Sequence, residues 1–417
     1  MYSPHTQCRA CGYAFHGAGG NRNPNERLVS VFSLGVQPLA NDFCQQGQER
    51  QGYAPLDVLF CERCRLAQLS VVVKPEVLYA NYAYVTSDSE TMRNHFAALV
   101  SDLISEQPAG PVVEIGSNNG TLLKYLAENG FTNTVGIEPA ENLALEANQA
   151  GVLTVNDFLN IQSAKRARES CGKVSFVLAR HCFCHADDWK GFVSGLEALA
   201  DQDTLIAIEV PYLPDQIANV SFDQCYHEHL SYLSLRAMSA LLAPSSLSIH
   251  KVIKYPIHGG CVLIMLRKSN SGRLPDPSVA EFTAQENITA DTWREFAAEA
   301  HAQIHKLGLL VRSLRESGKT VCGYGASAKS TVWVNACGFT KKDIAFITDT
   351  TKAKWNTVSP GTDIPITDPG ALLRELPDYC IIFAWNFAAE ILTKETLYKS
   401  KGGKFIVPIP HIKILGP

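Results

Sequence analysis

The sequence lacks an apolar run approaching the roughly 20 residues that a membrane-spanning helix needs. Residues 1–9 have neither the charged start nor the apolar core of a secretory signal, so we expect none. Basic residues are not in excess: 37 lysines and arginines stand against 41 aspartates and glutamates, for a formal net charge of -4. A nucleic-acid-binding domain usually carries a basic surplus. We therefore expect a cytoplasmic protein that binds neither a membrane nor nucleic acid.

A disulfide framework is also missing. The chain has 13 cysteines, an odd number, and most of them are scattered at spacings that suggest no pairing. In a reducing compartment they would be free thiols.

Four N-terminal cysteines are the exception, because they form two knuckles, Cys8-x-x-Cys11 and Cys61-x-x-Cys64. This spacing lets two thiolates of one tight turn bind the same tetrahedral ion. Four thiolates leave no position for water, so the site is structural. We predict bound zinc, with residues 21–25 in an exposed loop or hairpin between the knuckles. The alternative is four unrelated reduced cysteines.

A glycine turn follows the first apolar strand of the next region. The turn runs from Gly116 to Gly120 and leads into an amphipathic helix. Glycine lets the backbone approach a ligand, and open α/β sheets bind nucleosides at the carboxyl ends of their strands. Glu114 beside the turn can approach an ammonium group but would repel a pyrophosphate. The candidate ligand-binding residues here are Glu114, Gly116, Asn118, Asn119 and Gly120.

The next two strands end in residues that suit a nucleoside. Glu138, after the strand at residues 134–137, is placed to accept hydrogen bonds from both hydroxyls of a ribose. Asp157 and Phe158 follow the third strand, where an acid and an aromatic ring can bracket an adenine. Together with Glu114 these residues indicate S-adenosylmethionine as the cofactor.

Residues 222–232 concentrate titratable groups, and we interpret them as the reaction centre. Tyr226, His227, Glu228 and His229 are consecutive, and histidine and tyrosine are the side chains most often used to move protons near neutral pH. The alternative is a solvated loop with a chance His-x-His.

Three other residues are predicted to join this centre. The strand at residues 175–179 runs into a loop that carries His181 and His185, over the same edge of the sheet. Tyr84, in an aromatic run before a helix at residues 91–105, is a weaker candidate.

A second α/β unit is predicted near the C-terminus. An amphipathic helix at residues 291–317 ends at Gly318, and the strand at residues 320–324 opens into a glycine and serine loop with Lys329. A helix start with backbone N–H groups and a lysine is a good anion site. The alternative is a fold copy used only for packing. The candidate substrate residues are His181, Tyr324, Lys329, Ser330, Asp349, Trp385 and Asn386.

These motifs resemble, in order and over almost the whole chain, the sugar C-methyltransferases of deoxysugar biosynthesis. The segments that carry the resemblance are the two Cys-x-x-Cys pairs, Glu-Ile-Gly-Ser-Asn-Asn-Gly, Phe-Cys-His-Ala-Asp, Tyr-His-Glu-His-Leu-Ser-Tyr and Gly-Tyr-Gly-Ala-Ser-Ala-Lys-Ser. The resemblance implies transfer of a methyl group from S-adenosylmethionine to C-3 of a nucleotide-linked 4-keto-6-deoxyhexose, commonly carried on dTDP.

The resemblance also implies roles for individual residues. His229 would be the base, with Tyr226, Glu228, His185 and Tyr84 around the sugar. This sequence departs from the family pattern at His181, where the family has an asparagine, and at Ser327 and Ser330, which replace the more usual proline and glycine. These departures leave the sugar and its nucleotide open.

The sequence thus predicts an α/β protein of three domains: a zinc-binding lobe (1–75), a Rossmann-like class I methyltransferase domain (76–270), and a smaller Rossmann-like domain that binds the sugar nucleotide (271–417). We expect the strand at residues 261–266 to lie at the last edge of the middle domain. We also expect a monomer. Two other functions stay open: an O- or N-methyltransferase on a nucleotide sugar, and a non-catalytic zinc-containing binding protein.

Overall fold

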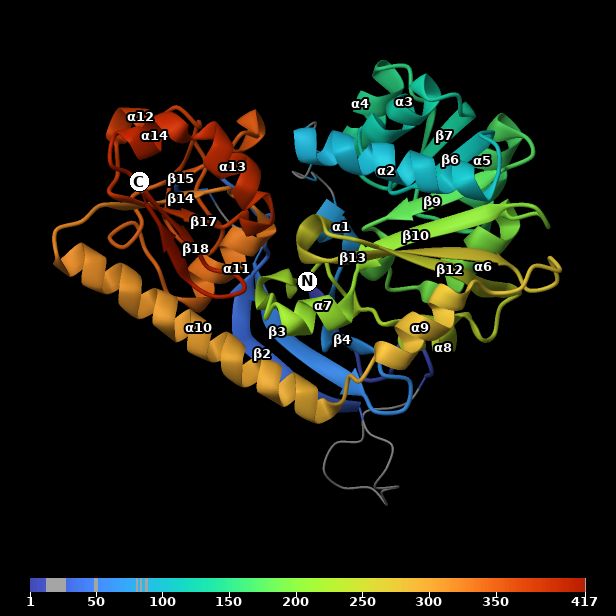
Figure 1. Ribbon diagram of the computed structural model, residues 1–417, viewed down its shortest axis with the longest axis horizontal. Coiled ribbons are helices and arrows are strands. Elements are labelled where there is room, and N and C mark those ends of the chain that lie inside the picture. The colour runs from blue at the N-terminus through green and yellow to red at the C-terminus, as the bar shows by residue number, and fades with distance from the viewer. Residues whose placement is uncertain (13–27, 49–51, 80–81, 83–84, 87–88, 417) are drawn as a thin grey trace.

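A computed structural model of the chain describes residues 1–12, 28–48, 52–79, 82, 85–86 and 89–416. Tyr84 and residues 21–25 lie outside this part of the chain. The described strands form sheets of two, four, six and seven strands, and Figure 1 shows the two larger sheets side by side, with the N-terminal strands below and between them.

The N-terminal lobe is antiparallel. Its elements are β1 (Tyr2–Pro4), β2 (Leu28–Pro38), β3 (Tyr53–Cys61), β4 (Ala67–Leu69), β5 (Val71–Val73) and α1 (Pro75–Tyr79). β1 pairs with β5, while the four-stranded sheet has the order β11-β4-β3-β2. β11 (Ser231–Tyr232) comes from the end of the Tyr226–His229 motif and pairs with β4. The lobe therefore holds the chain directly after the motif.

The middle domain is built on a seven-stranded sheet of order β12-β13-β10-β9-β6-β7-β8. Its strands are β6 (Pro111–Ile115), β7 (Thr132–Glu138), β8 (Thr154–Asn156), β9 (Phe176–Arg180), β10 (Leu205–Pro211), β12 (Leu247–Tyr255) and β13 (Cys261–Lys268). β6 to β10 are parallel, and β13 runs antiparallel to both of its neighbours. The edge strand is β12, so the expectation that residues 261–266 lie at the edge was wrong.

Helices cover both faces of this sheet, which explains why its central strands β6, β9 and β10 are mostly apolar and buried. The helices are α2 (Glu90–Glu106), α3 (Thr121–Glu128), α4 (Glu141–Gln149), α5 (Ile161–Cys171), α6 (Trp189–Leu199), α7 (Leu213–Ala218), α8 (Leu235–Leu242) and α9 (Pro277–Gln285), with short turns η1 (Phe183–His185), η2 (Phe222–Gln224) and η3 (Ile257–Gly259). α2 and α3 share one core with alternate strand residues, and α5, α6 and α8 share the other.

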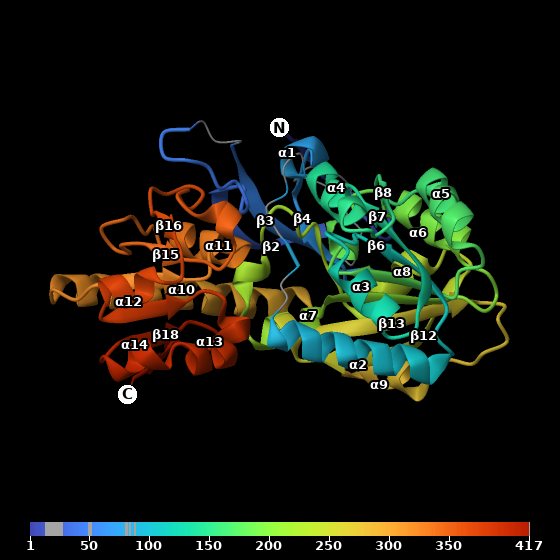
Figure 2. The same ribbon diagram turned by 90° about the horizontal axis from the view of Figure 1, so that it is seen from above.

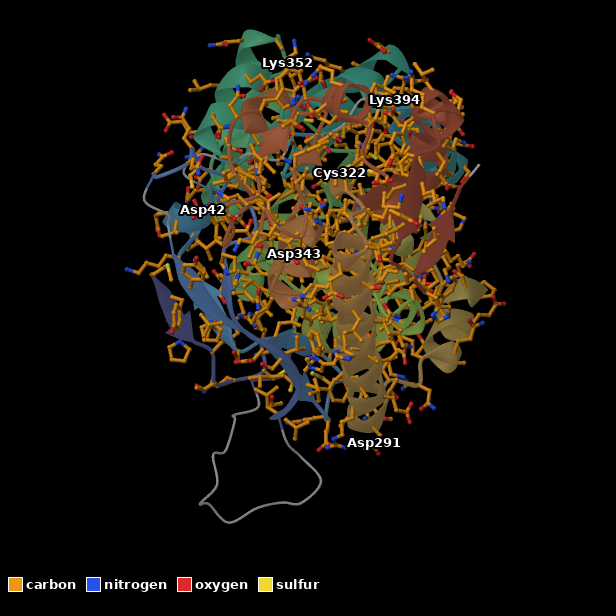
Figure 3. All side chains as sticks on the ribbon, turned by 90° about the vertical axis from the view of Figure 1, so that its left-hand side faces the viewer. Asp42, Asp291, Cys322, Asp343, Lys352 and Lys394 are labelled. Atoms are coloured by element: carbon orange, nitrogen blue, oxygen red, sulfur yellow. The ribbon has the colours of Figure 1, made fainter. Side chains whose placement is uncertain are left out.

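The C-terminal sheet has the order β16-β15-β14-β17-β18-β19, and only β19 is antiparallel to its neighbour. Its elements are β14 (Val321–Tyr324), α11 (Ala328–Ala336), β15 (Ile347–Thr348), η4 (Lys352–Lys354), β16 (Ile366–Thr367), α12 (Ala371–Glu375), β17 (Tyr379–Ile382), η5 (Trp385–Phe387), α13 (Ala388–Lys394), α14 (Thr396–Ser400), β18 (Lys404–Val407) and β19 (Lys413–Leu415). Figure 3, with this domain towards the viewer, labels Cys322 of β14 and Lys352 of η4.

Helix α10 (Ala290–Glu316) follows α9 in the chain and packs against both the lobe and the C-terminal domain. Thr289 and Thr292 form a capping box at its start, and Gly318, with φ +77°, follows its end. Its apolar stripe, which includes Trp293 and Phe296, lies in one core with residues of β2 and of the C-terminal sheet. Figure 1 shows the helix running below both parts, and Figure 3 labels Asp291 at its lower end.

The two Rossmann-like domains also touch each other directly. In the view of Figure 2, α2 of the middle domain reaches α13 of the C-terminal domain, and the Thr91 hydroxyl donates a 2.5 Å hydrogen bond to Glu390. Among the described helices, none is both long and apolar enough to cross a membrane.

Candidate active site

The four knuckle cysteines come together in the lobe. Sγ of Cys8 lies 3.3 Å from Sγ of Cys64, Sγ of Cys11 lies 3.6 Å from Sγ of Cys61, and all four atoms are within 4.8 Å of one another. Thiolates around a tetrahedral zinc, at about 2.3 Å from the ion, stand about 3.8 Å apart. The four sulfur atoms therefore fit a closed zinc site.

The zinc knuckle is tied to the motif through Arg9. The buried guanidinium of Arg9 donates to the carbonyls of Leu69 and Leu230, at 3.3 Å each, and pairs with Asp187. Leu230 directly follows His229 in the chain. The metal site thus supports the backbone next to the proposed base.

The glycine turn has the backbone that only glycine adopts easily. Gly116 and Gly120 have φ of +65° and +77°. A Cβ on Gly116 would stand 2.7 Å from Cβ of Cys182, and one on Gly120 would stand 2.9 Å from the Val152 side chain. Asn118, between them, also has a positive φ, and its side chain accepts from the Thr86 amide at 3.0 Å.

Two buried carboxylates flank this turn. Glu138 accepts the backbone N–H of Asn118 and of Ala140, each at 2.8 Å and each on a different oxygen. Each oxygen keeps a second lone pair for a ribose hydroxyl. Oε2 of Glu114 is buried without a hydrogen-bond partner among the described residues, and burial raises the pKa of this carboxyl to about 8. A cationic ligand would satisfy Glu114, so the turn fits S-adenosylmethionine.

The other predicted cofactor residues are less closely grouped. Asp157 pairs with Arg166 at 2.5 Å, and its amide donates to the Glu138 carbonyl. The Phe158 ring is 48% exposed. The Asn119 amide group donates to Glu146 at 3.3 Å.

His229 and Tyr226 form a hydrogen-bonded pair at the reaction centre. Nδ1 of His229 lies 2.8 Å from the Gln224 carbonyl, which can only accept, so this nitrogen carries the proton. Nε2 lies 2.6 Å from the Tyr226 hydroxyl and accepts its hydrogen. Burial holds the pKa of His229 well below 6.5, with His185 acting in the same direction. His229 is therefore a neutral imidazole whose lone pair faces a phenol.

Glu228 accepts hydrogen bonds from side chains in the N-terminal half of the chain. Its carboxylate accepts from Asn41 of the lobe at 2.7 Å and from the Tyr82 hydroxyl at 2.9 Å. Tyr82 also exchanges backbone hydrogen bonds with the Asn142 side chain of α4. Burial raises the pKa of Glu228, while the nearby Lys354 opposes this.

His185 lies beside the pair, as predicted, with its ring 5.1 Å from that of His229. Its Nδ1 is 3.4 Å from the Tyr79 hydroxyl, and burial lowers its pKa to about 4. His227 is different: it is 1% exposed and its Nε2 lies 3.1 Å from the Ala54 carbonyl, so it fastens the motif to β3.

His181 sits over a buried carboxylate. Its backbone φ is +52°, its Nε2 lies 2.6 Å from Glu209, and its ring packs edge-on against His258. Glu209 is fully buried and also contacts His95 at 2.7 Å and Arg180 at 3.4 Å. Burial alone would raise the pKa of Glu209, but Arg180 and His181 hold it well below 4.5.

In the C-terminal domain, Lys329, Trp385 and Asn386 lie together. The Lys329 ammonium is 4.5 Å from the centre of the Trp385 ring and donates to Asn386 at 3.2 Å. Asn386 in turn contacts His258 of the middle domain at 3.4 Å. This cluster therefore stands at the boundary between the two Rossmann-like domains.

The remaining predicted substrate residues are arranged differently. The Ser330 hydroxyl is buried and donates to the Ser327 carbonyl at the start of α11. Tyr324 packs in a core of the C-terminal domain and donates to Glu395 at 3.0 Å. Asp349 is 4.0 Å from Lys354, whose ammonium donates to the Ala326 carbonyl of the glycine loop.

Sequence reasoning missed Asn41, Tyr82 and Lys354 as neighbours of Glu228. Each comes from a different part of the chain, and none lies in a motif with recognisable spacing. Tyr82 stood in the aromatic run that the sequence singled out. Lys354 gave no signal, because its 7% exposure depends on the packing of η4 against the lobe residue Phe43.

Fold and site together define an S-adenosylmethionine-dependent methyltransferase with an N-terminal zinc-binding lobe. Family models match three consecutive parts of the chain: a zinc binding domain at residues 24–79, a methyltransferase domain at residues 89–251, and a C-methyltransferase C-terminal domain at residues 256–410. The C-methyltransferase NovU of Streptomyces niveus is 35% identical over 422 residues, which cover 99% of this chain and 97% of NovU. The chain belongs to the C-methyltransferase family, and its cofactors are S-adenosylmethionine and zinc.

Two solved methyltransferase structures each resemble less than half of this chain. The N-methyltransferase NodS of Bradyrhizobium japonicum WM9 is 11% identical with a TM-score of 0.33, covering 46% of this chain and 100% of NodS. Magnesium protoporphyrin IX methyltransferase of Synechocystis PCC 6803, with bound S-adenosylmethionine, is 15% identical with a TM-score of 0.31, covering 42% of this chain and 79% of that enzyme.

Proposed function

We propose that this enzyme methylates C-3 of a nucleotide-linked 4-keto-deoxyhexose. The observation that carries the proposal is the Tyr226–His229 pair, a buried neutral imidazole bonded to a phenol at 2.6 Å. C-methylation needs a carbon nucleophile, and a ketone at C-4 acidifies the C–H bond at C-3. Neighbouring residues suit a sugar nucleotide, and the sequence resembles sugar C-methyltransferases.

His229 is the base in this proposal. The Tyr226 oxygen takes the C-3 proton while its own proton passes to Nε2 of His229, so the pair gains one proton and the substrate becomes an enolate. The Nδ1–H bond to the Gln224 carbonyl stabilises the resulting imidazolium. When bound, S-adenosylmethionine would supply an electrophilic methyl group for C-3 of the enolate, and its S–CH3 bond would break to leave S-adenosylhomocysteine.

Other residues hold the substrate oxygens and exclude water. His185 is neutral at physiological pH and can donate one N–H to the enolate oxygen. Glu228, fixed by Asn41 and Tyr82, can accept from a sugar hydroxyl or amine. His181, paired with Glu209, is the third polar group of this set.

The nucleotide end is assigned to the C-terminal domain. Lys329 brings a positive charge to the domain boundary, where it can pair with a diphosphate, and Trp385 offers an aromatic wall. Lys354 adds a second buried ammonium near the same glycine loop. We further propose that the chain acts as a monomer in the cytoplasm, where its cysteines outside the zinc site would stay reduced.

The test is turnover with defined substrates. The purified enzyme is incubated with S-adenosylmethionine and a panel of nucleotide-linked hexoses, with and without the 4-keto group, and the products are analysed by mass spectrometry and NMR. We expect one added methyl group, bonded to C-3, only in 4-keto substrates. Methylation of an oxygen or nitrogen, or of sugars that lack the ketone, would overturn the proposal.

A further inference from the structure

Asp223 is a buried carboxylate that the reaction does not use. It is fully buried in η2, three residues before Tyr226. Its Oδ2 accepts two indole N–H groups from the C-terminal domain, from Trp385 at 2.7 Å and from Trp333 at 3.0 Å. Burying a carboxylate is costly unless it is hydrogen-bonded, so this arrangement needs both indoles.

η2 also positions the base. The residue after Asp223 is Gln224, whose carbonyl accepts the Nδ1–H of His229 at 2.8 Å. That bond alone fixes the tautomer that leaves Nε2 free to accept a proton. A small rotation of η2 would move the carbonyl and release the imidazole.

The Trp385 end of this connection lies at the proposed nucleotide site. The Lys329 ammonium stacks on the Trp385 ring, and Gly259 of the middle domain is packed so closely that a Cβ would stand 2.3 Å from the ring. The Trp385 ring therefore has little space in which to move. A ligand bound to Lys329 would contact or displace the same ring whose N–H group donates to Asp223.

We propose that Asp223 is a positioning residue that couples occupancy of the nucleotide site to the tautomer of His229. The inference rests on the proposed function. A sugar nucleotide that orders Lys329 and Trp385 fixes Asp223 and η2, and thereby the Gln224 carbonyl. The base is competent only when the C-terminal domain is engaged.

The main test is Asp223→Asn. The amide keeps the shape but loses the charge, so the two indole hydrogen bonds to this side chain lose their charge assistance and weaken. We expect the rate of C-3 proton exchange into D₂O to fall about a hundredfold, as expected when a base is misplaced by about 1 Å. S-adenosylmethionine binding should stay unchanged. ¹⁵N NMR of labelled histidines, with the His229 signal assigned from His229→Gln, should show loss of the single Nδ1–H tautomer.

A matched pair of tryptophan variants tests the coupling and covers the case in which Asp223→Asn does not fold. Trp333→Phe and Trp385→Phe each remove one donor from the same oxygen, so each should lower kcat about threefold to tenfold. The Lys329 ammonium lies over the Trp385 ring, so Trp385→Phe should also raise KM for the sugar nucleotide, and by more than Trp333→Phe does.

Three outcomes would overturn the inference: wild-type exchange in Asp223→Asn, an unchanged His229 tautomer, or equal KM effects in the two tryptophan variants. Failure of the proposed function is distinguishable, because the wild-type enzyme itself would then show no exchange.

Discussion

Burial sets the charge of the side chains that face the reaction centre. His229 and His185 lose affinity for a proton mainly because they are buried, and Glu114 gains proton affinity for the same reason. At neutral pH the site therefore offers neutral imidazoles and a carboxyl group that awaits a cationic ligand. The protonation states of the imidazoles and of the carboxyl group can both be measured.

The pH dependence of kcat follows from His229. Its pKa lies well below 6.5, so the base is already deprotonated at neutral pH, and activity is lost only as the pH falls through that lower value. We expect kcat, measured at saturation of both substrates, to show no loss from protonation of the base at pH 6.5 or above. The acid limb of the profile should lie below this pH. An acid limb with a midpoint above 6.5 would contradict the assigned state of this imidazole.

Glu114 should make cofactor binding release a proton. Its pKa of about 8 leaves it mostly protonated at pH 7, and a cationic ligand favours the ionised form. Calorimetry in two buffers of different ionisation enthalpy should show close to one proton released per S-adenosylmethionine bound. Glu114→Gln should bind more weakly and release none. A wild-type enthalpy that is independent of the buffer would mean that another group meets the cation.

At the scale of elements, we propose that the two glycine turns at the carboxyl ends of β6 and β14 each bind one of the two ligands. The first is flanked by carboxylates and the second by lysines, so each suits a ligand of opposite charge. This division predicts that a change in one turn leaves the ligand of the other unaffected.

Lys329→Met removes a charged donor from the second turn and keeps the length of the side chain. It should raise KM for the sugar nucleotide about tenfold to a hundredfold, the range of one charged hydrogen bond, with little change in KM for S-adenosylmethionine. Lys352→Met, at an exposed lysine of the same domain, is the matched control and should behave as wild type. Equal rises in both KM values for Lys329→Met would indicate a folding defect instead.

Sequence patterns predicted those helices and strands for which the apolar periodicity and the residues at the two ends indicate the same boundaries. The helix expected at residues 291–317 is α10, Ala290–Glu316, because its apolar stripe, threonine cap and terminal glycine all point to the same boundaries. The edge strand β12 was missed, since residues 247–255 mix lysines with apolar residues and show no clean alternation. β11, with two residues, carries no pattern at all.

For the site, consecutive residues were easier to predict than distant ones. His229, Tyr226 and Glu228 share one motif, and His185 joins them because parallel strands end at one edge of the sheet. Asn41 and Lys354 meet Glu228 only because the lobe and the C-terminal domain pack around it, and packing between domains leaves no local signature.

At the scale of the whole molecule, the proposed reaction centre lies where all three parts of the chain meet. Glu228 of the middle domain binds Asn41 of the lobe, and Lys354 of the C-terminal domain lies nearby. The zinc site contributes through Arg9, which bonds to Leu230 beside the base. A structural metal can supply on the order of 10 kcal/mol, comparable with the stability of a domain.

Zinc removal should therefore lower both stability and turnover. We expect elemental analysis to find one zinc per chain, and a strong chelator to lower Tm and abolish methyl transfer, with recovery when zinc is added back. Cys61→Ser should lose the metal, whereas Cys44→Ser, at a buried thiol of the same lobe outside the cluster, should keep it. Full activity in zinc-free protein would refute the link through Arg9.

The most direct test of the account is solvent exchange at C-3 without methyl transfer. The enzyme is incubated in D₂O with a 4-keto sugar nucleotide and S-adenosylhomocysteine, which cannot donate a methyl group, and NMR follows the C-3 proton. If His229 removes that proton through Tyr226, deuterium enters C-3 with the wild-type enzyme and not with His229→Ala, which still binds both ligands. Wild-type exchange and turnover in His229→Ala, or no exchange in the wild-type enzyme, would contradict the account.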